Sequence, residues 1–263
     1  MKDYYDFELL TPCLCHGASK TTAEMRIPSI RGHLRRWHTI LFGSEDMKLT
    51  WGTASGKVIS SRVILRLLPV NNAPESQMPQ QVLPHVKVGP KAFTCSALKR
   101  GTRYRLLVAF RPMTSEQVRE RVDRVITSWL YLGCVGMRSS RAFGSVWPQG
   151  AKPDEADFCK EVRSAAEKLA IMISAKTVPK IDLAICTDTL SGGDNEKYFG
   201  YVKGRNRLTS PLKMKYIRLA DGFHLVLYAT SEEIVSRALE QLDNAGKPLG
   251  KIKFTRISDG RPL

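Results

Sequence analysis

Residues 25–43 read MRIPSIRGHLRRWHTILFG, and the spacing of their side chains predicts the helix around which the fold is organised. Pro28 and Ser29 can open a helix, because a proline in the first turn costs no hydrogen bond. Apolar residues then recur every three or four positions, at Ile30, Leu34, Trp37 and Leu41. Gly43 follows the last apolar turn, where a helix commonly ends. We therefore expect an amphipathic helix with one face in the core.

Basic side chains form a second stripe on the same helix. Arg31, Arg35 and His38 repeat the apolar spacing one position later, about 100° around the helix axis. His33 and Arg36 lie close by. Guanidinium groups suit phosphate recognition because their planar fork donates two parallel hydrogen bonds. The stripe predicts an edge that binds phosphate, and the alternative interpretation is a solvated basic face on a core helix.

The formal net charge of the 263-residue chain is +16 and is unevenly distributed. Residues 1–150 hold 22 Lys+Arg against 10 Asp+Glu, whereas residues 151–263 hold 19 against 15. A basic excess of this size is typical of nucleic-acid binders, and the first half is the expected main surface for a polyanion. No apolar run approaches the ~20 residues that span a membrane. The N-terminus also lacks the apolar core of a secretory signal, so we expect a cytoplasmic protein with no membrane partner.

Cysteine and glycine patterns predict neither a metal site nor a cofactor. The six cysteines are expected to be reduced thiols, because no secretory signal is visible. Only Cys13, Cys15 and His16 stand close together, and no second pair of zinc ligands follows them. Residues 52–57, GTASGK, resemble a phosphate-binding loop but have three residues between their glycines instead of four. Val58 also replaces the Ser/Thr that would bind magnesium, so we expect no nucleotide hydrolysis.

Element order suggests two similar halves. The first half is expected to contain, in order, a strand at 4–10, the helix at 28–43, a polar connection at 44–56, a β-rich segment at 58–70, an irregular excursion at 71–91, a strand at 102–110 and a helix at 115–132. The second is expected to contain a helix at 158–173, a strand at 180–187, a polar loop at 190–209, strands at 212–217 and 224–229, a helix at 232–242 and a strand at 250–257. Each order is compatible with βαββαβ, so we predict an α+β fold with two tandem ferredoxin-like (RRM-like) domains, at 1–149 and 154–263.

Residues 133–148, GCVGMRSSRAFGSVWP, are the second informative stretch. Glycines allow close approach of the backbone to a ligand, and successive N–H groups can form an anion-binding concavity. Arg138 and Arg141 add positive charge, and Phe143 can offer a face for base stacking. We expect this loop to lie beside the helix at 25–43 and to complete one RNA surface. The alternative is a glycine-rich turn with a buried phenylalanine.

Three blocks of the sequence resemble the RAMP superfamily of CRISPR effector proteins, and are most like the large tandem RAMP subunits of type III-B (Cmr) complexes. These blocks are FELLTPCLCHGA at 7–18, RIPSIRGHLRRWHTILFG at 26–43 and GMRSSRAFGSV at 136–146. The family's TP turn and Gly-Ala loop are matched by Thr11-Pro12 and Gly17-Ala18. Its helix motif PSIRG-x-LR-x-W is matched by Pro28 to Gly32, Leu34-Arg35 and Trp37.

The family's glycine-rich loop, roughly GxRSRRGFGS, is matched by Gly136, Arg138, Ser139, Arg141, Phe143, Gly144 and Ser145. Ser140 stands where the family has an arginine, and Ala142 where it has a glycine. A further family segment, Arg…SPL, is matched in the second half by Arg207, Ser210, Pro211 and Leu212.

The resemblance implies two tandem RAMP domains and a non-catalytic, RNA-binding subunit of a multisubunit complex. Such a subunit would cap the assembly near the 3′ end of the CRISPR guide RNA, help to hold guide and target RNA, and contact other RAMP subunits. The residues expected to bind RNA are His16, Arg31, His33, Arg35, Arg36, His38, Gly136, Arg138, Ser139, Ser140, Arg141, Phe143, Gly144, Lys203, Arg205 and Arg207.

Two other functions stay open at this stage. Some RAMP proteins are metal-independent endoribonucleases that mature CRISPR RNA, and here His16, His33 and His38 would be the candidate acids and bases. The other is a stand-alone RNA-binding protein without companion subunits.

Overall fold

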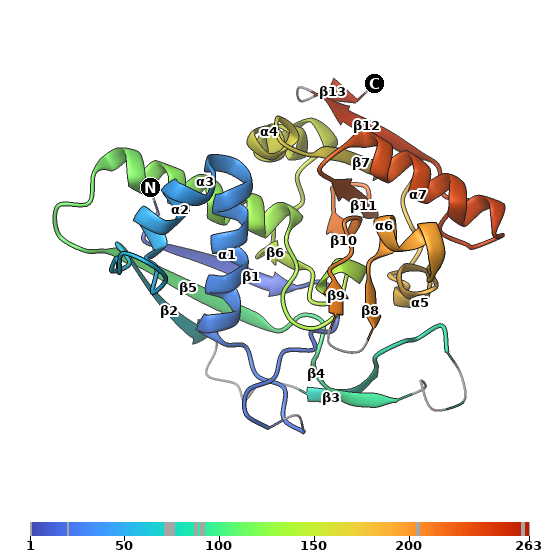
Figure 1. The fold of residues 1–263 in the computed structure, drawn as a ribbon, viewed down its shortest axis with the longest axis horizontal. Helices are drawn as coiled ribbons and strands as arrows, with labels where there is room; N and C mark the ends of the chain where they lie inside the picture. The colour runs from blue at the N-terminus through green and yellow to red at the C-terminus, as the bar shows by residue number, and fades with distance from the viewer. Residues whose placement is uncertain are drawn as a thin grey trace.

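Two antiparallel sheets, one in each half of the chain, form the framework of the protein (Figure 1). The computed structural model describes residues 2–19, 21–70, 77–86, 89, 93–203, 206–258 and 261–262. The fold is mixed α+β, as predicted. None of the helices in these ranges is long and apolar enough to cross a membrane.

The first sheet is built from strands that the sequence places far apart: β1 (Tyr4–Leu9), β2 (Val63–Pro69), β5 (Arg103–Phe110) and β6 (Val146–Pro148). Their order is β2-β5-β1-β6, and all neighbours are antiparallel. Helices α1 (Ile27–Phe42) and α3 (Glu116–Leu132) pack together over the face that carries Phe7 and Tyr104. Phe7 stacks on Tyr104 and meets Trp129 of α3 edge-on, each at 5.4 Å between ring centroids. This aromatic cluster anchors the first core.

The second sheet repeats that arrangement. Its strands are β7 (Ala170–Ser174), β10 (Lys213–Arg218), β11 (Phe223–Ala229), β12 (Phe254–Ser258) and β13 (Arg261–Pro262), in the order β10-β11-β7-β12-β13. Apart from the added β13, the strands follow the same chain order as in the first sheet: second, third, first, fourth. Nearly every residue of β10 and β11 is buried, because one face packs against the first half and the other lies beneath α7 (Glu232–Asn244).

Smaller elements decorate this framework. A hairpin of β3 (Gln77–Gln81) and β4 (Thr94–Leu98) leaves the first half, and one of β8 (Tyr201–Lys203) and β9 (Asn206–Leu208) leaves the second. Figure 1 shows both hairpins on the lower side of the view. The short helices are α2 (Ser44–Trp51), α4 (Glu155–Ala166), α5 (Leu183–Thr187) and α6 (Glu196–Phe199).

Five sequence predictions about local structure are wrong, and one of them is the polar loop at 190–209, which contains α6, β8 and β9. The polar connection at 44–56 contains helix α2, and β3 lies within the excursion at 71–91, of which residues 71–76, 87, 88, 90 and 91 are outside the described residues. The predicted helix at 158–173 ends at Ala166, and Ala170–Ser174 is strand β7. This strand is buried along its length, so its continuous apolar run carries no period that separates strand from helix. The predicted strand at 180–187 is helix α5, whose N-cap Asp182 accepts a hydrogen bond from the Ala184 amide at 2.8 Å.

Candidate nucleic-acid interface

Helix α1 carries three distinct faces. The first, formed by Ile30, Leu34, Trp37 and Leu41, is buried in the core as predicted. The second carries Arg31, Arg35 and His38, and turns towards α2 and β2. The third carries His33, Arg36 and Ile40, and turns towards the glycine-rich segment 133–148 and β10. Two of the three faces therefore carry basic side chains, in different surroundings.

The guanidinium groups of Arg31 and Arg35 have partners within the protein. Arg31 donates to Ser61 Oγ at 3.1 Å and to the Val63 carbonyl at 3.4 Å. Arg35 donates to the carbonyls of Trp51 and Gly52, the latter at 2.6 Å. Both side chains are half-buried, and they hold the segment after α2 against α1. Their contact with RNA phosphate stays a prediction.

His38 has a structural position in place of the expected RNA-facing one. Its side chain is fully buried. Its Nε2 lies 2.6 Å from an Asp46 carboxylate oxygen, and its Nδ1 accepts a hydrogen bond from the Trp51 indole at 3.0 Å. Burial lowers the pKa of His38, against the opposing effect of Asp46. The imidazole thus ties α2 to α1, and we leave it out of the RNA surface.

The glycine-rich segment lies beside α1, and its backbone is fixed by the loop after β1. The Met137 amide donates to the Leu14 carbonyl at 2.8 Å, and the Gly144 amide donates to the Pro12 carbonyl at 2.9 Å. Gly144 has φ 62°, and a Cβ atom there would lie 2.0 Å from the Val135 carbonyl oxygen. The Gly144 amide is therefore used inside the fold, contrary to the expectation that it would bind phosphate.

Two other predicted contact residues of this segment are also buried. Phe143 has no exposed surface and packs in the second core, so it offers no face for base stacking. Arg141 is only 6% exposed and donates to Ser210 Oγ at 2.9 Å and to the Phe199 carbonyl at 3.0 Å. It fastens the glycine-rich segment to the second half through Ser210, and we leave both residues out of the surface.

Just before Phe143 the segment makes a tight turn. Arg138 and Ala142 flank a short 3-10 turn and both adopt left-handed backbone conformations, with φ 61° and 63°. Such conformations cost free energy in residues other than glycine and tend to persist at functional sites. The turn places Arg138 at the surface, and Ser139 and Ser140 beside α1.

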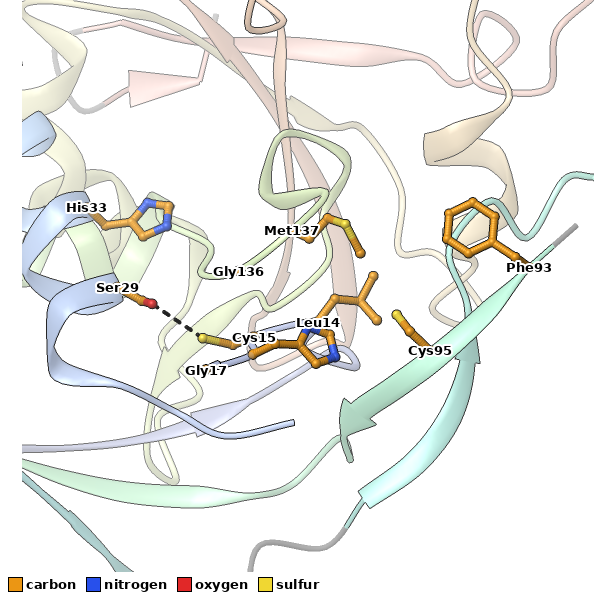
Figure 2. A pocket seen from close by; sticks show the side chains of 10 residues that line it. Leu14, Cys15, Gly17, Ser29, His33, Phe93, Cys95, Gly136 and Met137 are labelled. Atoms are coloured by element: carbon orange, nitrogen blue, oxygen red, sulfur yellow. Dashed lines mark hydrogen bonds between the residues drawn. The ribbon is translucent and has the colours of Figure 1, made fainter. Parts of the chain in front are cut away.

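A cavity of about 610 Å³ opens between the start of α1, the loop after β1, the glycine-rich segment and β4 (Figure 2). Figure 2 shows His33 on one side, Phe93 on the other, and Leu14, Met137 and Cys95 between them. Phe93 and Met137 are large apolar side chains that stay 49% and 43% exposed. His16 lines the same cavity and its Nε2 lies 2.7 Å from the Ser96 carbonyl oxygen. The lining is mainly apolar, which suits an unstacked base more than a phosphate.

A second, smaller cavity of about 50 Å³ adjoins the first at His33. Its polar lining comes from α1, the 3-10 turn, the end of the polar loop and β10: His33, Arg36, Ser139, Ser140, Thr209 and Lys213. Lys213 and Thr209 were not predicted as site residues. The available signal was a pair of lysines, in KMKYIR at 213–218, within a strand that is otherwise apolar or aromatic.

Two pairs of like charges are held close together, Lys213 with Arg36 at this cavity and Arg138 with Arg207. Burial and the charge of Arg36 lower the pKa of Lys213 to about 7, and burial with the charges of Arg36 and Lys213 lowers that of His33 to about 4. Burial and the neighbouring Arg207 lower the pKa of Arg138. In the part of the chain that the structure describes, no ion pair is formed by Arg36, Arg138, Arg207 or Lys213. Cations without acidic partners, held close together in this way, favour the binding of an anion.

Two further predicted residues, Lys203 and Arg207, lie on the β8–β9 hairpin. Arg207 is exposed on β9, and Lys203 ends β8 opposite Asn206. Arg205 lies outside the described residues. Among the residues that are described, no three His, Cys, Asp or Glu side chains come together as a metal site.

Comparison with known proteins places this chain in a family. Its sequence matches the family model of the RAMP superfamily over residues 6–147, more than half of its length. The fold is similar to the crystal structure of Cmr1 from Pyrococcus furiosus in the apo form, with a TM-score of 0.62 and 16% identity, covering 98% of this chain and 99% of that chain.

It is also similar to chains in two cryo-EM structures of the type III-B Cmr-beta bound to cognate target RNA, one of them with AMPPnP and in the presence of ssDNA. Both have a TM-score of 0.61, identities of 10% and 9%, and cover 92% of this chain and 98% of that chain. At these identities the likeness shows the fold. No curated protein matches the sequence. On the strength of the family model, this chain belongs to the RAMP superfamily.

Proposed function

We propose that this chain is a non-catalytic, RNA-binding subunit of a type III CRISPR effector complex that targets RNA in antiviral defence. In this role it caps the assembly near the 3′ end of the guide RNA, helps to hold guide and target RNA, and contacts other RAMP subunits in the cytoplasm. Its family supports a CRISPR role. The shared fold with Cmr1, and with chains of Cmr-beta bound to target RNA, supports type III-B and an RNA partner.

One observation carries the RNA-binding part of this proposal. Arg36 and Lys213, from the two halves of the chain, line one cavity, Arg138 and Arg207 form a second pair of neighbouring cations, and none of the four has an acidic partner among the described residues. Keeping such cations close together is unfavourable in isolation, and a polyanion removes the cost. The adjoining larger cavity offers apolar surface for a base. Phosphate and base sites side by side suit single-stranded RNA.

We also propose that the two sheets are tandem ferredoxin-like domains, at 1–149 and 154–263. The same strand order in both sheets supports this division. The segment between β6 and α4 is the connection, and Asp154 caps α4 by accepting a hydrogen bond from the Asp157 amide at 2.7 Å.

The test is RNA affinity as a function of salt. Replacing Arg138 and Arg207 together with alanine should weaken binding of single-stranded RNA, and should flatten the slope of log affinity against log salt by roughly 1.4, because about 0.7 is lost per phosphate contact. Replacing Arg163 and Lys168, which are exposed around the end of α4, is the charge-matched control and should leave the slope unchanged. An equal loss of RNA affinity in both double variants would mean that the effect comes from net charge alone.

One observation favours the alternative function, a metal-independent endoribonuclease. His16 and His33, two of its candidate acids and bases, line the same cavity. However, the pKa of His33 is lowered to about 4, which makes it a poor proton donor near neutral pH. His38, the third candidate, is buried away from both. Incubation of the purified protein with CRISPR repeat RNA in EDTA decides the question. We expect intact RNA, and site-specific cleavage that is lost in His33→Ala would establish the nuclease.

A further inference from the structure

The ammonium group of Lys213 lies at the small cavity without a partner among the described residues. The side chain is 5% exposed, it lines the cavity, and the described residues offer it neither a hydrogen bond nor an ion pair. Such a lysine, with little exposed surface and no partner among the described residues, is unfavourable because the protein interior solvates charge poorly.

Lys215, two positions further along β10, is a buried lysine with a structural role and provides a comparison. It has no exposed surface, and its Nζ donates to the carbonyls of Leu130, Gly133 and Val146 at 2.7, 2.7 and 2.5 Å. All three ammonium hydrogens are satisfied. Lys213 lies on the same face of the same strand, so its lack of acceptors marks a position that serves a ligand instead of the fold.

The other groups around the cavity are donors as well. Arg36 and His33 come from α1, Ser139 and Ser140 from the 3-10 turn, and Thr209 from the polar loop. The described lining contains no carboxylate. A volume of about 50 Å³ is too small for a base or a sugar but admits a tetrahedral oxyanion.

We propose that this cavity is a phosphate site at the junction of the two halves, in which Lys213 and Arg36 bind one phosphate group of the RNA. The proposal rests on the RNA-binding function above and adds the position and the chemistry of one contact. His33, neutral in its surroundings, and the hydroxyls of the turn supply further donors to the phosphate oxygens.

The first experiment uses inorganic phosphate as the probe. Thermal melts of the full chain at pH 6.5, at constant ionic strength with chloride as the reference, should show saturable stabilisation by phosphate. Lys213→Met should melt at the same temperature as the wild type or higher without phosphate, since it removes a charge that has no partner among the described residues, and should lose the response to phosphate. Lys168→Met, at an exposed position, should respond as the wild type does.

The second experiment measures RNA binding. Lys213→Met should weaken binding of a single-stranded oligonucleotide by roughly ten- to a hundredfold, as expected for loss of a charged hydrogen bond. Arg36→Gln, at the exposed rim of the cavity, should give a smaller loss of RNA affinity. It is the variant to use if Lys213→Met folds poorly. Equal losses for oligonucleotides ending in a 3′-hydroxyl and a 3′-phosphate indicate an internal phosphodiester, whereas loss confined to the 3′-phosphate form indicates a terminal phosphate.

The outcomes separate the phosphate site from the proposed function. A wild-type chain that binds RNA, with Lys213→Met and Arg36→Gln both binding equally well and both still stabilised by phosphate, would overturn the site and leave the function standing. A wild-type chain that binds no RNA would overturn the function, while the phosphate melts would still decide whether the cavity takes an oxyanion.

Discussion

Lys213 should make RNA binding depend on pH. Burial, together with the charges of Arg36 and Arg141, lowers its pKa to about 7, well below the ordinary value of a lysine. A bound phosphate favours the ammonium form and raises that pKa, so above pH 7 binding takes up a proton. Below pH 7 Lys213 is already protonated in the free protein, so RNA affinity no longer depends on pH through this group.

Four other groups near Lys213 do not titrate in this window, whereas burial lowers the pKa of Lys215, two positions further along β10, to about 7. The pKa of His33 is about 4 and that of Arg141 about 10, and burial raises the pKa values of Cys134 and Tyr228. Affinity for an oligonucleotide with a 3′-hydroxyl should therefore fall between pH 7 and 9, by at most about tenfold per pH unit for one proton. Binding titrations of Lys213→Arg should be flat over the same range, and a wild-type curve that is equally flat contradicts the assignment.

The fold requires a glycine at position 144, because a side chain there has no room. Its φ of 62° disfavours other residues, and the Val135 carbonyl occupies the place of a Cβ atom. Gly150 has a similar φ of 72° but open space around it, which makes it a matched control. Gly150→Ala should cost about 1 kcal/mol from backbone strain alone. Gly144→Ala should cost clearly more in denaturant unfolding, and equal costs would show that the close contact relaxes without penalty.

Helix α1 joins the two halves through Trp37. This side chain is 3% exposed and its ring lies 5.8 Å from that of Tyr228 on β11, between ring centroids. Trp37→Ala should lower the free energy of unfolding by roughly 3–5 kcal/mol, as expected for truncating a buried aromatic residue. Thr39→Ala, at an exposed position of the same helix, controls for helix propensity and should change stability little. A cost below ~1 kcal/mol for Trp37→Ala in chemical denaturation would mean that the junction does not depend on this contact.

The position of a basic residue around the axis of α1 decides whether its side chain has partners inside the protein. Positions 31, 35 and 38 face α2 and β2, while 33, 36 and 40 face the glycine-rich segment, although all six lie within three turns. Internal carbonyls accept from Arg31 and Arg35, whereas Arg36 has no partner among the described residues. We therefore place the main phosphate contact on the His33–Arg36 face.

Lys215 connects the two sheets through the end of α3. Its three acceptors belong to α3, the residue after it, and β6, all in the first half. Lys215→Met leaves those buried carbonyls without a donor and should destabilise the protein by at least ~3 kcal/mol in thermal or denaturant unfolding. Because Lys213→Met is expected to be neutral or stabilising, the two variants should move stability in different directions. Parallel effects would remove the distinction between a structural and a ligand-binding lysine.

Much of the framework is readable in the amino-acid order. The apolar period at 30, 34, 37 and 41 identifies α1 and its buried face, since a helix fixes which residues share a side. The strands β1, β2, β5, β10 and β11 and the helices α3 and α7 follow from similar local patterns. Where the second sheet is buried on both faces, as in β7, this signal vanishes and the prediction fails.

Charge and glycine content pointed to an RNA surface formed by α1 and the segment at 133–148, and the two do lie side by side. The packing of the fold decided which of these residues remain available to contact RNA. His38, Arg141 and Phe143 found partners or burial inside the fold, and those choices depend on segments distant in the chain. Lys213 joined the cavity only because β10 packs against the first half. A helix period is set by neighbours three and four residues away, whereas the meeting of α1 with β10 is a long-range contact that local spacing does not encode.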